Sequence, residues 1–291
     1  MSSIKNVTVI GAGVIGAGWI IRSLAHNKKV VAFDKDLKLK KKIISEIKRT
    51  WPHVKKLFNK KNLNLKNFKY VTSIEEAVKK ADFIQECATE NYKIKIKLMR
   101  TIGNYAKPDA IISSSSSGLL PTRIYAKCKN QARTMIGHPF NPVYMCPGVE
   151  IVPGQKTKKK FLNKANQFYK SISMNPIMVK KELPGYLADR LQEALWREAL
   201  HIVNEGYAST RDLDRAIEDG PGLRWSLMGV FLTYHLAGGK AGMKHMLEQF
   251  GPALKLPWTK LKAPTLSKKL SSMVIQGTRQ QAKGKSVATI S

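Results

Sequence analysis

Residues 5–34 decide the fold and read KNVTVIGAGVIGAGWIIRSLAHNKKVVAFD. Two apolar runs rich in β-branched residues, Lys5–Ile10 and Val30–Phe33, predict buried strands. The run between them, Ala17–Asn27, has a helical pattern and follows a cluster of glycines. A strand, a glycine turn, a helix and a second strand form a βαβ unit. We therefore predict an α/β protein with a Rossmann-type, doubly wound sheet.

The glycines of this unit predict a dinucleotide site. Gly11, Gly13 and Gly16 form a GxGxxG pattern, which permits a tight turn and close approach of a pyrophosphate. The N-terminus of the following helix offers N–H groups and a partial positive charge to the phosphates. Asp34 ends the second strand, where it would accept hydrogen bonds from ribose hydroxyls and repel a 2′-phosphate. This pattern favours NAD as the cofactor, and a chance glycine-rich turn is the alternative.

Short apolar runs continue the sheet along the chain. The predicted strands are Tyr70–Thr72, Asp82–Glu86, Asp109–Ser113, Thr134–His138, Val149–Val152 and Ile177–Val179. The helical pattern of Leu37–Asn62 is expected to be interrupted at Pro52. Ligands collect outside the carboxyl ends of parallel strands, so Glu90 and the serine tract 113–117 are expected beside the glycine turn. For Glu90 a plain helix N-terminal acid is the alternative.

His138 and Glu150 form the predicted catalytic pair. His138 ends one strand, Glu150 lies near the start of the next, and the loop between them contains three prolines. The fixed φ of proline would make the second strand fold back beside the first. A histidine held by a carboxylate is an oriented general base, and the carboxylate stabilises its protonated form. A structural histidine is the alternative interpretation.

The apolar period changes from strand-like to helical after residue 183. We therefore expect an NAD-binding domain over residues 1–183 and a helical domain over residues 184–291. Ser209 and Asp212 predict a capping box at the start of one helix. Residues beyond Lys262 are polar and weakly patterned, which predicts a frayed end. The apolar stripes of the helical domain are typical either of its own core or of a homodimer interface.

Composition excludes several classes of protein. The 291 residues include 51 Lys and Arg against 20 Asp and Glu, a net charge of +31. The basic clusters are scattered along the chain and lack interleaved aromatic residues, so we expect no nucleic-acid partner. Three cysteines without CxxC spacing predict free thiols and no metal site. With no long apolar stretch in the sequence, we expect a cytoplasmic protein without a membrane partner.

Together these motifs resemble the L-3-hydroxyacyl-coenzyme A dehydrogenase superfamily over nearly the whole chain. GAGVIG resembles its nucleotide turn, Ala88–Asn91 its cofactor-side segment, and Gly137–Glu150 the segment of its catalytic His and Glu. The resemblance implies an NAD-dependent enzyme that oxidises an alcohol. It also implies roles for particular residues. These residues are Gly11, Gly13, Val14, Ile15, Gly16, Asp34 and Glu90 for NAD, His138, Glu150 and Ser117 for catalysis, and Asn141 and Ala188 for the substrate.

Asp189 departs from the family, which carries an asparagine there. A carboxylate near the reacting carbon suits a cationic substrate. The strings ADRLQEALWREALHIVNEG and GPGLRW resemble the branch of the family that oxidises L-carnitine, which implies this alcohol or a related 3-hydroxy acid as the small-molecule substrate. Aromatic faces recognise a quaternary ammonium, and Phe140 and Phe250 are the favoured candidates here. The other candidate aromatic residues are Trp225, Phe231, Tyr234 and Trp258.

Two other kinds of function stay open on the sequence. Within the enzymes, the alternatives are 3-hydroxyacyl-coenzyme A and L-gulonate dehydrogenases, and the positive charge favours the polyanionic coenzyme A substrate. Outside the enzymes, the scaffold would serve a crystallin-like structural protein or a basic nucleic-acid binder. The Ser117, His138 and Glu150 set argues against both of these.

Overall fold

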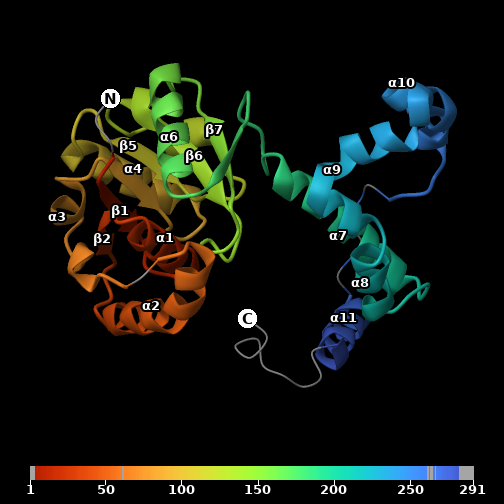
Figure 1. The fold of residues 1–291 in the computed structure, drawn as a ribbon, viewed down its shortest axis with the longest axis horizontal. Coiled ribbons are helices and arrows are strands. Elements are labelled where there is room, and N and C mark those ends of the chain that lie inside the picture. Colours follow the sequence, from red (N-terminus) through yellow and green to blue (C-terminus); the bar gives the residue numbers. More distant parts are fainter. Residues whose placement is uncertain (1–3, 61, 261, 263–264, 266, 282–291) are drawn as a thin grey trace. The chain divides into compact units, whose positions relative to one another are not determined.

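The chain divides into two compact units, Met1–Asp189 and Arg190–Ser291, and each is described by itself (Figure 1). A computed structural model describes residues 4–60, 62–260, 262, 265 and 267–281. The first unit is a sheet with helices on both faces, and the second contains helices. This α/β fold followed by a helical region confirms the fold class predicted from the sequence.

The sheet of the first unit has eight strands in the order β3-β2-β1-β4-β5-β6-β7-β8. The strands are β1 Asn6–Ile10, β2 Lys29–Phe33, β3 Phe68–Val71, β4 Phe83–Glu86, β5 Ile111–Ser114, β6 Thr134–Pro139, β7 Gly148–Pro153 and β8 Asn175–Met178. All neighbours are parallel except β6 and β7, which are antiparallel. The strand order reverses direction between β1 and β4, which is where doubly wound sheets bind their ligands.

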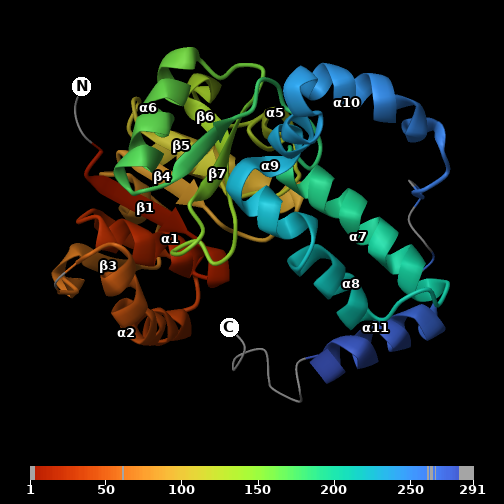
Figure 2. The same cartoon turned by 45° about the vertical axis from the view of Figure 1, so that its right-hand side comes forward.

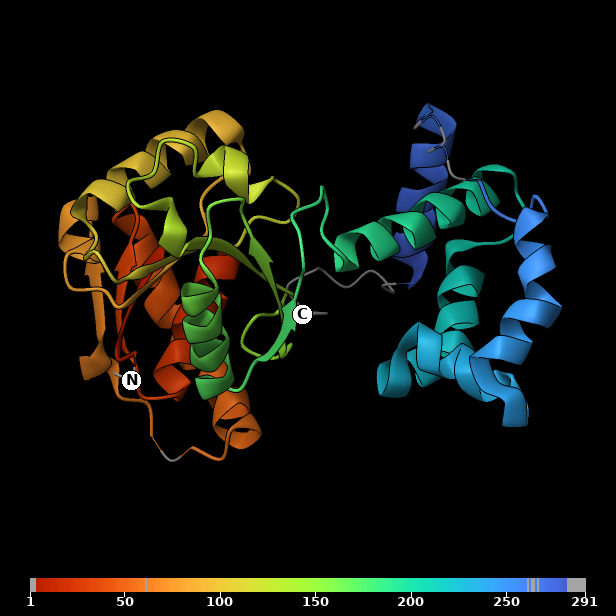
Figure 3. The ribbon, with the colours of Figure 1, turned by 90° about the horizontal axis from the view of Figure 1, so that it is seen from above.

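Two helical layers cover the sheet, as Figures 2 and 3 show. One buried cluster joins the sheet to α1 Val14–Ala25, α2 Lys38–Leu57 and α6 Lys159–Ser171. The other joins it to α3 Ile74–Val78, α4 Tyr92–Tyr105 and α5 Pro121–Ile124. Because successive side chains of a strand point to opposite faces, Val9 belongs to the first cluster and Ile10 to the second.

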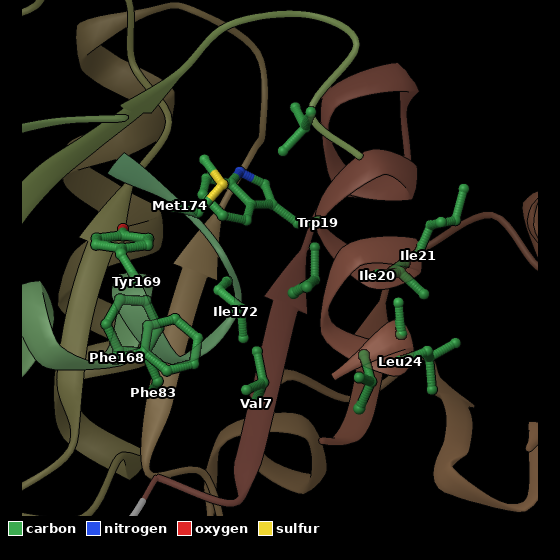
Figure 4. Packing of buried hydrophobic residues seen from close by; sticks show 14 of the residues in the cluster. Val7, Trp19, Ile20, Ile21, Leu24, Phe83, Phe168, Tyr169, Ile172 and Met174 are labelled. Carbon is green, nitrogen blue, oxygen red and sulfur yellow. The ribbon is translucent and has the colours of Figure 1, made fainter. Parts of the chain in front are cut away.

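Aromatic side chains fill the first cluster between α1 and α6 (Figure 4). The rings of Phe83 and Phe168 stack with centroids 4.0 Å apart, and Trp19 and Tyr169 lie 5.5 Å apart. All four side chains are at most 4% exposed. Each large apolar side chain removed from water contributes about 1.5–3 kcal/mol, so this layer holds α1 firmly under the glycine turn.

Helix α2 runs through Pro52, so the predicted interruption is wrong. Pro52 has no N–H and leaves the carbonyl of Lys48 without its helical partner. Both residues are exposed, so water can satisfy that carbonyl. On the opposite side, Trp51 and Val54 are buried against the core and keep the helix in place.

Helix α7 Ala188–Asn204 begins at the end of the first unit, and the second unit contains the rest of it together with α8 Thr210–Glu218, α9 Pro221–Ala237, α10 Gly242–Phe250 and α11 Lys268–Gln281. Short 3₁₀ turns lie at Leu65–Asn67, Gln131–Arg133, Gly239–Ala241 and Gly251–Lys255. The predicted capping box of Ser209 and Asp212 is present at the start of α8. Among the described residues, no helix is both long enough and apolar enough to cross a membrane.

Helix α11 contradicts the frayed end predicted after Lys262 for residues 268–281, whereas residues 282–291 lie outside the described residues. Its Leu270 is fully buried, and Gly277 lies close to Thr210 of α8. These contacts join α11 to its own unit, although Ile275 is exposed, and neither contact gives a periodic signal in the sequence.

Candidate active site

His138 and Glu150 lie directly opposite each other on the antiparallel strands β6 and β7. The Nδ1 atom of His138 is 2.8 Å from Oε2 of Glu150. His138 is 5% exposed and Glu150 is fully buried. The fold-back expected from the prolines is therefore confirmed, and it leaves Nε2 as the ring nitrogen that can meet a substrate.

The second oxygen of Glu150 caps the start of α7. Oε1 accepts hydrogen bonds from the backbone N–H groups of Leu187 at 2.9 Å and Ala188 at 3.1 Å. Burial raises the pKa of this carboxyl, but the hydrogen bonds from His138, Ala188 and Leu187 outweigh burial and bring the pKa below its ordinary value. Glu150 is therefore a carboxylate at neutral pH.

Asp189 approaches the imidazole from its other side. Its Oδ1 atom is 3.9 Å from Nε2 of His138, beyond hydrogen-bond distance, and its side chain is 30% exposed. The ring of Phe140 lies 5.3 Å from the imidazole. A substrate bound at Nε2 would thus lie beside a carboxylate and an aromatic ring.

The serine tract is a set of specific contacts rather than a plain loop. Ser114 donates to Glu86 at 2.5 Å, and Ser116 donates to Glu90 at 2.5 Å. Ser115 accepts from Trp19 Nε1 at 3.0 Å and from Gln85 at 2.7 Å, and Ser113 pairs with Tyr169. Ser117 is the exposed member of the tract, and its N–H donates to Glu90 at 3.1 Å.

A buried ion pair supports this tract. Lys95 of α4 and Glu86 of β4 are 1% and 0% exposed, with Nζ 2.8 Å from Oε1. The same ammonium lies 3.4 Å from Oε2 of Glu90. Glu90 therefore connects the ion pair to Ser116 and Ser117, and its role on the cofactor side of the site stays a prediction.

The glycine turn fits a dinucleotide. Gly11 has a φ of +97°, and a Cβ there would lie 2.8 Å from the carbonyl of Cys87. A Cβ on Gly16 would lie 1.9 Å from the carbonyl oxygen of Gly11. Around Gly13, the first residue before α1, nothing lies within 4 Å of a Cβ. Two glycines are thus needed by the fold, and the third leaves space for a ligand at the helix N-terminus.

A cavity of about 660 Å³ extends from this turn and has Gly11, Gly13 and Asp34 in its wall. Asp34 accepts a hydrogen bond from the N–H of Ala12 at 2.9 Å, which holds its carboxylate at the end of β2. Val14 is 71% exposed beside the turn, whereas Ile15 packs against the core. These features fit the adenosine half of NAD, with Asp34 available to the ribose hydroxyls.

Arg22 ties α1 to the loop that follows His138. It is 1% exposed and donates to the carbonyls of Val143 at 2.7 Å, Cys146 at 3.1 Å, Ile172 at 3.0 Å and Ser173 at 2.8 Å. Burial lowers its pKa to about 10, so the guanidinium stays charged at neutral pH. Neither this clamp nor the Lys95 and Glu86 pair had a signal in the sequence.

The other predicted substrate residues are spread over both units. Asn141 is exposed in the loop after β6, and Ala188 begins α7. Trp225 of α9 and Phe250 of α10 belong to the second unit, and their substrate contacts stay predictions. Sequence reasoning missed Tyr186, a fully buried residue whose ring lies 5.7 Å from that of His138.

A dinucleotide turn and an oriented histidine at the carboxyl ends of parallel strands in one sheet are typical of NAD-dependent dehydrogenases. The family models described as "3-hydroxyacyl-CoA dehydrogenase, NAD binding domain" and "3-hydroxyacyl-CoA dehydrogenase, C-terminal domain" match residues 6–183 and 185–288. The chain belongs to the 3-hydroxyacyl-CoA dehydrogenase family, and its cofactor is NAD, as the sequence predicted.

Two similar proteins extend over nearly the whole chain. L-carnitine dehydrogenase of Oceanobacillus iheyensis is 50% identical over 283 residues, covering 97% of this chain and 92% of that protein. L-carnitine dehydrogenase of Pseudomonas putida is 49% identical over 290 residues, covering 100% of this chain and 90% of that protein. Both names fall within the branch that the substrate-domain strings resemble.

Solved structures show the same fold at lower identity. The NAD⁺-dependent dismutase 5-formyl-3-hydroxy-2-methylpyridine 4-carboxylic acid 5-dehydrogenase is similar with a TM-score of 0.79 and 23% identity, covering 97% of this chain and 96% of that one. (S)-3-Hydroxybutyryl-CoA dehydrogenase of Ralstonia eutropha has a TM-score of 0.70 and 24% identity, covering 94% and 95%. These likenesses concern the fold alone.

Proposed function

We propose that this enzyme oxidises L-carnitine to 3-dehydrocarnitine with NAD⁺. The observation that carries the proposal is the similarity to L-carnitine dehydrogenases at 50% and 49% identity over nearly the full chain. The carboxylate of Asp189, 3.9 Å from Nε2 of His138, supports it because L-carnitine carries a quaternary ammonium near its hydroxyl.

His138 is the general base of the proposed reaction. Its Nε2 takes the proton of the secondary hydroxyl, while the exposed Ser117 hydrogen-bonds the same oxygen and helps orient it. Glu150 fixes the ring through Nδ1 and stabilises the imidazolium that forms. NAD⁺, when bound, accepts the hydride from the carbon that bears this hydroxyl.

The ammonium group has two candidate partners at the imidazole. The Asp189 carboxylate supplies negative charge, and the Phe140 ring, 5.3 Å from the imidazole, supplies an aromatic face. Trp225 and Phe250 are the further aromatic walls that we propose. The domain boundary at residues 183 and 184 and the roles of Val14, Ile15, Asn141 and Ala188 are part of the same proposal.

Side-by-side assays of NADH formation from L-carnitine, 3-hydroxybutyryl-coenzyme A and L-gulonate test the substrate. We expect kcat/KM for L-carnitine to exceed the other two by at least about 100-fold, a difference near 2.7 kcal/mol. The net charge of +31 favours the coenzyme A ester as the second candidate. Activity confined to the ester or to L-gulonate would refute the proposal.

Asp189→Asn tests the proposed charge recognition. The carbon isostere of L-carnitine, 3-hydroxy-5,5-dimethylhexanoate, has the same shape without the positive charge. We expect the variant to lose roughly fivefold in its preference for L-carnitine over this isostere, since a partly exposed charge pair is worth about 1 kcal/mol. An unchanged preference would remove Asp189 from ammonium recognition.

We also propose that the enzyme is a homodimer through its helical unit. Three of its apolar side chains are buried among the described residues, Leu200, Val203 and Leu270. By contrast, Leu227 and Phe231 of α9 are each 83% exposed. Helices with so little core need an apolar cover, and a second copy of the same surface supplies one.

Sedimentation analysis tests this assembly. We expect the wild-type chain to sediment as a dimer at micromolar concentration and the Leu227→Glu, Phe231→Glu double variant as a monomer. A monomeric wild type would overturn the proposal. We further propose a cytoplasmic location, which the three free thiols Cys87, Cys128 and Cys146 support.

A further inference from the structure

Tyr186 adopts an unusual backbone conformation beside the catalytic pair. Its φ is +46°, in the left-handed region that residues with a Cβ seldom adopt, and it follows Gly185 with a φ of +71°. The side chain is fully buried. Such a conformation costs on the order of 1–3 kcal/mol and persists only where the surrounding contacts hold it.

The first set of contacts reaches the segment that follows Ser117. The Tyr186 hydroxyl donates to the carbonyl of Leu119 at 2.6 Å, and the N–H of Gly185 donates to the carbonyl of Gly118 at 3.4 Å. The two carbonyls directly after Ser117 are thus held by consecutive residues of one segment.

The second set reaches the His138 and Glu150 pair. The Tyr186 ring lies 5.7 Å from the imidazole at an interplanar angle of 60°, an edge-to-face contact. The next two N–H groups, of Leu187 and Ala188, donate to Oε1 of Glu150. Tyr186 therefore contacts the imidazole, the segment after Ser117 and, through its neighbours, the carboxylate.

We propose that Tyr186 is a positioning residue for the alcohol oxidation, and this inference rests on the proposed function of the site. Its hydroxyl fixes the carbonyl of Leu119 and so sets where Ser117 stands. Its ring packs against the imidazole and so sets the position of His138 relative to Ser117. A misplacement of about 1 Å between two groups that share one substrate oxygen is enough to slow a reaction strongly.

Tyr186→Phe tests the hydroxyl while keeping the ring. Tyr125→Phe is the matched control, because Tyr125 is also buried and donates to the carbonyl of Met135 at 2.7 Å, and within the described part of the chain it makes no hydrogen bond or ring contact with His138 or Glu150. We expect Tyr186→Phe to lower kcat about tenfold when kcat is expressed per NAD⁺-binding site. Kd for NAD⁺ should stay within twofold of wild type. Tyr125→Phe is expected to lower Tm by a similar amount and leave kcat per site unchanged.

Normalisation to NAD⁺-binding sites separates positioning from folding. A merely structural tyrosine would reduce the number of binding sites and leave kcat per site intact, and that outcome would overturn the inference. The comparison is made on the alcohol that the wild type oxidises fastest. A wild type inactive on L-carnitine but active on another alcohol would therefore refute the proposed substrate while still testing Tyr186.

Discussion

Glu150 combines two tasks in one carboxylate, since Oε2 holds His138 and Oε1 holds the start of α7. Its pKa in the folded protein lies below the ordinary value of 4.5. A carboxyl with a lowered pKa stabilises the fold above its unfolded pKa, and this contribution is lost as pH falls through the folded pKa. Acid should therefore loosen the catalytic pair and the helix start together.

Glu150→Gln should flatten the loss of stability below about pH 4.5, because the substituted amide does not titrate. Urea unfolding between pH 3 and pH 7 measures this, with the exposed Glu75→Gln as the control that keeps the wild-type slope. The same variant should lower kcat roughly 100-fold through loss of imidazolium stabilisation. A wild-type acid slope in Glu150→Gln would contradict the assigned pKa direction.

His138→Ala should lower kcat by about 10²–10⁴, the usual contribution of a general base, and leave Kd for NAD⁺ within twofold. Steady-state kinetics and a fluorescence titration with NAD⁺ check both parts. His53→Ala, on the exposed side of α2, is the control and should behave as wild type. Turnover retained in His138→Ala would restore the structural interpretation of this histidine.

The contact between His138 and Glu150 was predictable because strand ends, proline positions and residue chemistry all appear in the sequence. Tyr186 was not, since its importance depends on a positive φ and on a carbonyl 67 positions away. The hydrogen bonds of Arg22 could not be predicted for a related reason. Its partners are main-chain carbonyls, and backbone acceptors carry no residue-type signal.

At the scale of elements, the glycines of the turn between β1 and α1 have two different roles. Gly11 and Gly16 are required by the backbone, whereas Gly13 leaves space for the ligand. Gly13→Ala should keep Tm within about 2 °C, because nothing lies within 4 Å of the added methyl group. The same methyl group occupies space that the pyrophosphate needs, so Kd for NAD⁺ should rise at least about tenfold.

Gly16→Ala is the matched contrast at this turn. Its Cβ would lie 1.9 Å from the carbonyl oxygen of Gly11, so the turn must distort, and we expect a lower Tm together with weaker binding. Thermal unfolding and NAD⁺ titration of both variants distinguish the two effects. Equal binding by Gly13→Ala and wild type would argue against a pyrophosphate at this turn.

The strands could be predicted from the sequence more reliably than the helix ends. Buried parallel strands are continuous runs of β-branched residues, which leave a strong local signal. The continuity of α2 through Pro52 depends instead on tertiary anchoring by Trp51 and Val54. Helix α11 depends on Leu270 and on a close contact at Gly277, and both lie outside what periodicity can detect.

At the scale of the whole molecule, the net charge of +31 opposes compaction through self-repulsion. Salt shortens the range of this repulsion from about 30 Å at 0.01 M to about 8 Å at 0.15 M. We expect Tm to rise by several degrees over this range of NaCl. In a Lys41→Glu, Lys42→Glu variant of the exposed face of α2, the rise should be smaller; an equal rise would point to specific ion binding.

The guanidinium of Arg22 grips the 143–146 loop only through main-chain oxygens, at Val143 and Cys146. The side chains of Met145 and Cys146 can therefore change without loosening these contacts, whereas Val143 packs against Gly18 and Tyr144 packs against the core, so both are kept. A combinatorial library over positions 145 and 146 would preserve the backbone path of the loop that follows β6 while altering its side chains. The hydrogen bonds of Arg22 thus make this short loop a natural place to vary the sequence.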